Sequence, residues 1–551
     1  MRANVRRHGS AELGVGPGLR IDELHDAGGA GAGELTLESA SSWLMGAPLS
    51  YLAAGLCLAL VAVWLPLYLA WPWWADLDAY AVMAHSWDVG VRPYRDIAVY
   101  NFPGQIYEFW VLGRAFGWSA TWSIYALDAA LLVGFGGVLV WWSRRVLGRA
   151  LPGWIGFVTF LTYYLGLDWT NVAQRDWRAA WSALTAMLIL QASRSRAAGV
   201  LAALLFAVGF SIRPYAILFL PAALVAAAHG ADGAERTRAA AVRSSLAWIV
   251  AFAAITAMLF VPLVADGLLG DFLRMLEMAR SRYGGRSPST LIRNLAGQCS
   301  FGNLAIYLGL LLAWLKADRA CRPLVLACGL ATVAAFAYRL VAPLDHLYLR
   351  HPLRLAIAVD VALLVGIGLR TMDLTATGRL MLTLLLAGAG SMASGPSTLW
   401  YPHCAAMGMR ALRAGVPLEK APPGVTMAYP WRDYQRALDY LRRETSASTR
   451  VANLLRERSP ALCGPTARLP VFPVDTPSLD WLWLNSFHTE ADFVGFLERA
   501  DDSVVVWSPD EPGWHDPLER PYEALTQSVR RLYRPAARFG TIEVWTRIHE
   551  G

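Results

Sequence analysis

Long apolar segments alternate with shorter polar ones over the first 394 residues of the chain. About 20 apolar residues in a helix cross the ~30 Å hydrocarbon core of a bilayer. The pattern therefore predicts an α-helical polytopic membrane protein with about eleven transmembrane helices. We expect these helices near residues 49–71, 119–142, 152–167, 178–193, 197–212, 214–229, 245–266, 302–316, 322–341, 353–370 and 377–394.

A long polar interval, residues 72–118, separates the first two expected helices. Trp71, Trp73 and Trp74 stand at its start, and tryptophan is enriched where helices leave the bilayer. We therefore interpret the interval as an external loop that begins at an aromatic belt. Its acidic residues are Asp76, Asp78, Asp88, Asp96 and Glu108.

The pattern changes again after residue 394. Residues 431–444 place apolar side chains on one helical face, and residues 502–508 and 541–547 are typical of strands. We expect residues 395–551 to form a small soluble α/β domain and residues 49–394 to form the transmembrane domain. The Gly-, Ala- and Arg-rich residues 1–48 are expected to be a disordered cytoplasmic tail.

The net charge of +7 comes almost wholly from arginine, because lysine occurs only at Lys316 and Lys420. In a membrane protein such an excess sets orientation, so we expect membrane lipids and no nucleic acid as partners. The arrangement predicts a multi-pass protein of the cytoplasmic (inner) membrane, with a cytoplasmic N-terminus and an extracytoplasmic C-terminal domain. The short basic clusters that mark the cytoplasmic side are Arg144-Arg145-Arg149 and Arg236-Arg238-Arg243.

Asp76 and Asp78 are the first candidates for chemistry. A carboxylate at the membrane edge can act as a general base on an acceptor hydroxyl or amine. The alternative is that both are solvated charges at the start of a helix, where carboxylates are favoured.

Two further polar sites adjoin expected helices. Arg175 and Asp176 directly precede one, where ionisable side chains are costly unless they face a cavity or a partner; a helix cap is the alternative. Arg213 lies between two short spans, and arginine suits bidentate phosphate recognition. Its alternative is snorkelling to the interface.

Two later external segments could bind an anion. Residues 267–301 carry five arginines, among them Arg282 and Arg286, which suit lipid phosphates; a basic amphipathic surface helix is the alternative. Residues 345–352 contain His346, Tyr348 and Arg350, and the composition of this turn by itself is not specific to one ligand. Two histidines and an aspartate there could hold a divalent cation, but their spacing is not diagnostic, and we assign no metal ligands.

The first loop contains, in order, Asp76-Leu-Asp78-Ala-Tyr80, Gly90, Arg92-Pro-Tyr94-Arg95-Asp96 and Asn101-Phe-Pro103-Gly104. This pattern resembles the first external loop of GT-C glycosyltransferases, a family that includes protein O-mannosyltransferases and lipid A aminoarabinose transferases. These enzymes take a sugar from a polyprenyl-phosphate carrier. The family's second acidic residue is Leu77 here, which leaves open whether Asp76 or Asp78 is the base.

The resemblance implies a membrane glycosyltransferase that moves a hexosyl or pentosyl group from a polyprenyl-phosphate donor to a lipid, glycan or protein acceptor. No cofactor is firmly implied. The rival interpretations are a transporter or flippase of lipid-linked saccharides, and a non-catalytic envelope scaffold. The implied catalytic residues are Asp76, Asp78 and Asp176, and the implied substrate-binding residues are Tyr80, Arg95, Asp96, Arg175, Arg213, Arg282, Arg286, His346, Tyr348 and Arg350.

Overall fold

The structure is a computed structural model. It describes residues 41, 47–97, 101–229, 237–283, 288–317, 321–341, 347–372, 374–394, 406, 409–410, 421–422, 425, 427–455, 461–472, 489–509 and 522–548. Most of the expected N-terminal tail, and most of the segment that would join the two expected domains, lie outside these residues.

Every one of the expected membrane helices coincides with a helical segment. They are α2 (Ala47–Leu69), α5 (Trp122–Trp142), α6 (Leu151–Tyr164), α7 (Arg175–Ala192), α8 (Arg196–Ile212), η4 (Pro214–Phe219) with α9 (Leu220–His229), α10 (Arg238–Ala265), α13 (Phe301–Lys316), α14 (Arg322–Val341), α15 (His351–Thr371) and α16 (Ala376–Ser394).

Among the described residues, five helices are long and apolar enough to cross a membrane, or up to six if one bent pair counts as a single span. The chain therefore has the helices of a multi-pass membrane protein. The larger number of about eleven crossings stays a prediction, as does the orientation, because several helices are shorter or more polar than a full span.

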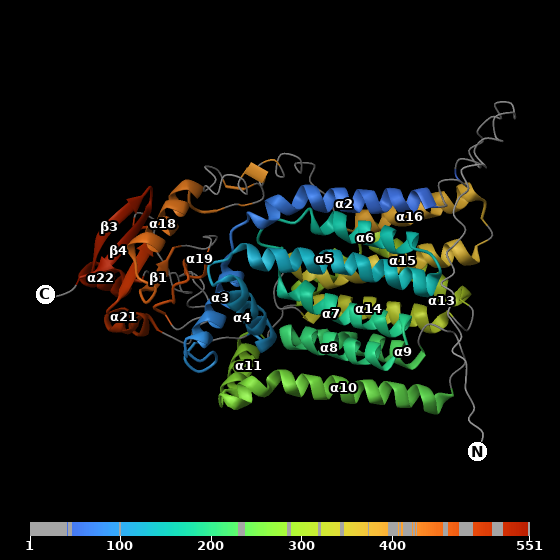
Figure 1. Cartoon of the computed structure of the whole chain (residues 1–551), viewed down its shortest axis with the longest axis horizontal. Coiled ribbons are helices and arrows are strands. Elements are labelled where there is room, and N and C mark those ends of the chain that lie inside the picture. Colours follow the sequence, from blue (N-terminus) through green and yellow to red (C-terminus); the bar gives the residue numbers. More distant parts are fainter. Residues whose placement is uncertain are drawn as a thin grey trace, which may run out of the picture.

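The helices form a bundle whose long helices run side by side along the long axis of the molecule (Figure 1). Helix α15 lies at the centre of the bundle, because 94% of its most apolar stretch is buried. In α10, by contrast, only 11% of the most apolar stretch is buried. Small residues allow close helix contacts. At Gly156 of α6, a Cβ atom would lie 2.3 Å from the carbonyl oxygen of Ala358 in α15.

The interval 72–118 is largely helical rather than a simple loop. It contains α3 (Ala75–Asp88) and α4 (Pro103–Phe116), which lie at one end of the bundle beside α11 (Leu269–Tyr283) (Figure 1). Asp88 joins the two helices, because it pairs with Arg114 at 2.6 Å and accepts a hydrogen bond from Trp110 at 3.0 Å. The interval is therefore a folded unit that can hold side chains in place.

The aromatic-belt interpretation is wrong for Trp71 and Trp73. A belt exposes its rings at the lipid–water interface, but these side chains are only 1% and 3% exposed. The Trp73 Nε1–H donates to the carbonyl oxygen of Thr121, 2.7 Å away. These tryptophans fix the start of α3 by packing inside the protein.

The C-terminal domain is a mixed four-stranded sheet in the order β1-β2-β4-β3. The expected helix and two strands are confirmed as α18, β2 and β4. Strand β1 pairs with β2 in parallel, and β4 pairs antiparallel with both β2 and β3. Its elements are α18 (Trp431–Glu444), β1 (Arg450–Leu454), α19 (Cys463–Thr466), α21 (Glu490–Arg499), β2 (Ser503–Trp507), α22 (Glu523–Leu532), β3 (Tyr533–Phe539) and β4 (Ile542–Arg547).

Candidate functional site

Asp176, at the start of α7, is a fully buried carboxylate between two arginines. Its Oδ1 lies 3.2 Å from Nε of Arg213, and its Oδ2 lies 3.9 Å from Nε of Arg175. The hydroxyl of Tyr338, in α14, donates to the same carboxylate. Buried charges are tolerated when they are paired and hydrogen-bonded in this way. Asp176 therefore pairs with two guanidinium groups, more closely with that of Arg213.

Helix α3 brings a second carboxylate close to Arg175. The Arg175 guanidinium lies 5.5 Å from the ring centroid of Tyr80, within cation–π range. Asp76 and Tyr80 are four residues apart, so they share one face of α3. Asp76 is half-buried, and its charge acts on Tyr80, on Arg175 and on Tyr348.

Gly104 allows α4 to approach the end of α8, which leads into Arg213. A Cβ atom there would lie 2.6 Å from the backbone of Ser211, two residues before Arg213 at the end of α8. Only glycine permits such an approach. Arg213 then turns over the ring of Tyr215, with 5.4 Å between guanidinium and centroid.

We call this group the Asp176 cluster. It joins one face of α3 to α7, the end of α8, α14 and the turn η5 (Leu347–Arg350). All its members except Tyr338 are expected site residues. Tyr338 was missed because a single tyrosine in an apolar helix carries no signal of function. The members are Asp76, Tyr80, Arg175, Asp176, Arg213, Tyr338 and Tyr348.

Asp78 faces away from this cluster. Residues two apart on a helix do not share a face, and the buried Asp78 accepts a hydrogen bond of 2.6 Å from the backbone N–H of Gly464 in α19. Burial raises the pKa of Asp78 to about 7, although the N–H groups of Gly464, Cys463 and Leu462 act to lower it. Its contacts are those of a residue that joins α3 to the C-terminal domain.

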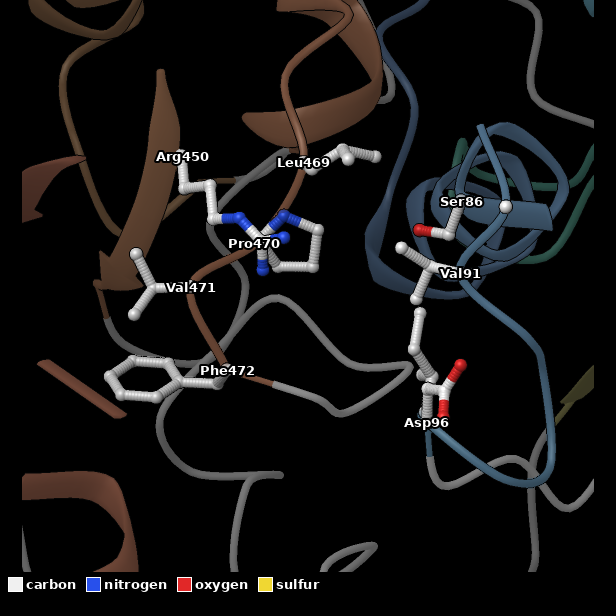
Figure 2. Close-up of a pocket in the computed structure, with 10 residues that line it drawn as sticks. Ser86, Val91, Asp96, Arg450, Leu469, Pro470, Val471 and Phe472 are labelled. Carbon is white, nitrogen blue, oxygen red and sulfur yellow. The ribbon is translucent and has the colours of Figure 1, made fainter. Parts of the chain in front are cut away.

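Arg95 and Asp96 also make their contacts outside the Asp176 cluster. Arg95 pairs with Asp271 at 2.9 Å and donates to the carbonyl oxygen of Gly267 at 2.7 Å, so it ties the first loop to α11. Asp96 accepts a hydrogen bond from the backbone N–H of Arg92 at 2.8 Å. It lines a pocket of about 290 Å³ between the first loop and the C-terminal domain (Figure 2).

Of the remaining expected site residues, only Arg350 has a described side chain. Arg350 is partly buried near Tyr163 and Arg354, on the turn that leads into α15. His346 and Arg286 lie outside the described residues, as does the side chain of Arg282. Within the part of the chain that is described, no three His, Cys, Asp or Glu side chains are grouped as a metal site would require.

A buried ionic network beside the cluster was missed by sequence reasoning. Arg178, on α7, lies 3.1 Å from Glu108 of α4 and 3.9 Å from Asp128 of α5. It also donates to the side chain of Gln105 at 3.0 Å. Asp128 accepts further hydrogen bonds, including one of 2.5 Å from Trp177. The network fixes α4 and α5 against the start of α7, which carries Arg175 and Asp176.

Replacing Arg178 with methionine is expected to destabilise the protein by about 3–5 kcal/mol, because the buried Asp128 and the partly buried Glu108 lose their cation. Thermal unfolding of the purified protein measures the effect. The matched control adds Glu108→Gln and Asp128→Asn, which should restore much of the stability. A change below about 1 kcal/mol in Arg178→Met would contradict the importance of the network.

The arrangement in the Asp176 cluster suits acid–base chemistry on an anionic substrate. Asp76 is the half-buried carboxylate and can accept a proton. The side chains of Arg175 and Arg213 remain 15% and 17% exposed, so neither is fully enclosed by the protein. Asp176 is buried and already occupied by these arginines, which suits orientation rather than proton transfer.

Comparison with known proteins identifies the fold. The sequence matches no protein-family model and no curated protein. ArnT from Cupriavidus metallidurans is similar in structure: its undecaprenyl phosphate-bound form aligns with a TM-score of 0.54 and 15% identity, covering 92% of this chain and 99% of ArnT. The apo form gives 0.55 and 14%, covering 91% and 99%.

The oligosaccharyltransferase of Archaeoglobus fulgidus aligns more weakly, with a TM-score of 0.38 and 14% identity over 88% of this chain and 72% of that one. The likeness to ArnT extends over nearly the whole of both chains. The chain therefore has the GT-C fold of membrane glycosyltransferases.

Proposed function

We propose that this protein is an inverting glycosyltransferase that takes a hexosyl or pentosyl group from a polyprenyl-phosphate carrier. The observation that carries the proposal is the Asp176 cluster, in which the half-buried Asp76 lies near Arg175, and Arg175 and Arg213 both pair with Asp176. The similarity in fold between this protein and an ArnT crystallised with undecaprenyl phosphate supports this donor class. The acceptor is a lipid, glycan or protein at the outer face of the cytoplasmic membrane.

In the proposed reaction, Asp76 removes a proton from the acceptor hydroxyl or amine. The acceptor atom forms a bond to the anomeric carbon from the side opposite the phosphate. The bond between that carbon and the phosphate oxygen breaks, and the phosphate leaves with the electron pair. Arg175 and Arg213 neutralise the leaving polyprenyl phosphate, a preorganised electrostatic effect that usually contributes much of such catalysis. A single displacement inverts the anomeric configuration.

Asp176 orients the arginines in this scheme and is not the base. Tyr80 and Tyr348 form walls of the same site. We also propose the domain division at residues 394 and 395, and an extracytoplasmic C-terminal domain. This orientation places the Asp176 cluster at the outer face, since α3 lies at the end of the bundle that adjoins that domain (Figure 1).

The proposal is tested by supplying membranes that contain the protein with a panel of radiolabelled polyprenyl-phosphate sugars. We expect label to pass from at least one donor to an endogenous lipid, glycan or protein. Membranes without the protein are the control. Translocation of intact lipid-linked sugar without transfer would instead support the transporter interpretation.

A further inference from the structure

The first turn of α3 is held from two sides. On one side, Asp76 and Tyr80 belong to the Asp176 cluster. On the other side, Asp78 accepts the 2.6 Å hydrogen bond from the Gly464 N–H of the C-terminal domain. The proposed base and the contact with this domain therefore lie back to back on one helical turn.

A second contact joins the same two segments just before this turn. The backbone N–H of Ala461 donates to the carbonyl oxygen of Trp73 at 3.1 Å. The ring of Trp73 is itself fixed by its hydrogen bond to Thr121. Tyr434, in α18, donates to the carbonyl oxygen of Ala461 at 2.5 Å. A chain of contacts thus runs from α18 through Ala461 to the start of α3.

The contact at Gly464 has no spare room. A Cβ atom on this residue would lie 2.5 Å from the ring of Trp73 and 2.6 Å from Oδ1 of Asp78, and both side chains are buried. At the other end of α3, near Ser86, the domain and the first loop instead leave the pocket of about 290 Å³ (Figure 2). Tight packing is therefore found at the turn that carries Asp76.

We propose that the C-terminal domain positions the base: the Gly464 N–H, acting through Asp78, fixes the turn of α3 that carries Asp76. Asp78 is then a positioning residue. The inference rests on the proposed function, because it gives the domain a role in the same reaction. Displacing a reacting group by about 1 Å can cost about 100-fold in rate.

Protonation of Asp78 affects the same contact. The titratable groups that face Asp78 from the elements packed on it are Tyr434 of α18 and Cys463 of α19. Burial raises the pKa of Asp78 from its ordinary value of 3.8 to about 7. The folded arrangement that buries this carboxyl is therefore most stable below about pH 4, and this contribution is lost as the pH rises to about 7.

The experiment compares full-length wild type with Gly464→Ala, Asp78→Ala and Asp78→Asn. Gly495→Ala is the matched control, because its new Cβ would meet only the end of the Arg499 side chain, at 3.1 Å. Hydrogen exchange of residues 75–88 reports the order of α3, and kcat and KM for transfer report its consequence.

We expect Gly464→Ala and Asp78→Ala to lose exchange protection in α3 and to lower kcat about 10- to 100-fold, with a smaller change in KM. Asp78→Asn keeps an acceptor oxygen and should retain transfer. The hydrogen-exchange protection of α3 should change between pH 4 and pH 7 in wild type but not in Asp78→Asn, which lacks the titrating carboxyl. Wild-type protection of α3 in Gly464→Ala would overturn the inference, whether or not transfer is detected. Absence of transfer by wild type would instead overturn the proposed function.

Discussion

Asp76→Asn is expected to reduce glycosyl transfer by about 10²- to 10⁴-fold, the range that a positioned general base contributes. Asparagine preserves the size of the side chain and its place on the face of α3 shared with Tyr80. It cannot accept the proton of the acceptor, so the loss should fall mainly on kcat. Initial rates of transfer from a polyprenyl-phosphate sugar, measured with purified variants, check the prediction.

Asp78→Asn is the matched control for this variant. It makes the same chemical change two residues away, on the opposite face of the helix, where the carboxylate contacts Gly464. We expect it to keep most of its transfer activity. If Asp78→Asn lost activity and Asp76→Asn kept it, the assignment of the base to Asp76 would be refuted.

Arg213→Met is expected to lower kcat/KM about 10²- to 10³-fold, the cost of removing one preorganised group that stabilises developing charge. The substitution also removes the closer cationic partner of the buried Asp176, which lies 3.2 Å from Nε of Arg213. Thermal unfolding must therefore be measured beside the kinetics, so that loss of the folded protein is separated from loss of transfer.

Arg213→Lys is the informative comparison. Lysine keeps the charge but lacks the planar fork that contacts a carboxylate and a phosphate together. We expect activity between those of wild type and Arg213→Met. Wild-type transfer by folded Arg213→Met would exclude this arginine from the stabilisation of the leaving phosphate.

The membrane helices could be predicted because the length of an apolar run is a local property of the sequence. Asp76, Arg175 and Arg213 could be singled out for a related reason, since each charge stands beside an apolar run. The family resemblance gave these residues an expected role. Tyr80 followed from the same resemblance, because it belongs to the matched run Asp76-Leu-Asp78-Ala-Tyr80.

Other features depend on contacts between distant parts of the chain. Asp78 and Gly464 are 386 positions apart, and no local pattern indicates that they meet. Asp128 and Asp360 are buried within apolar helices, where one carboxylate hardly changes the average hydropathy. Strand β3 contains Pro535 and two arginines, and proline disfavours a strand unless it lies at a sheet edge, as this one does.

The most direct test of the central proposal follows both products of one reaction. Purified protein would receive a doubly labelled polyprenyl-phosphate sugar and its acceptor fraction, and free polyprenyl phosphate, transferred sugar and anomeric configuration would be measured together. We predict equal amounts of the two products and inversion at the anomeric carbon, with the formation of both products slowed about 10²- to 10⁴-fold in Asp76→Asn. Retained configuration, or transfer that releases no polyprenyl phosphate, would contradict it.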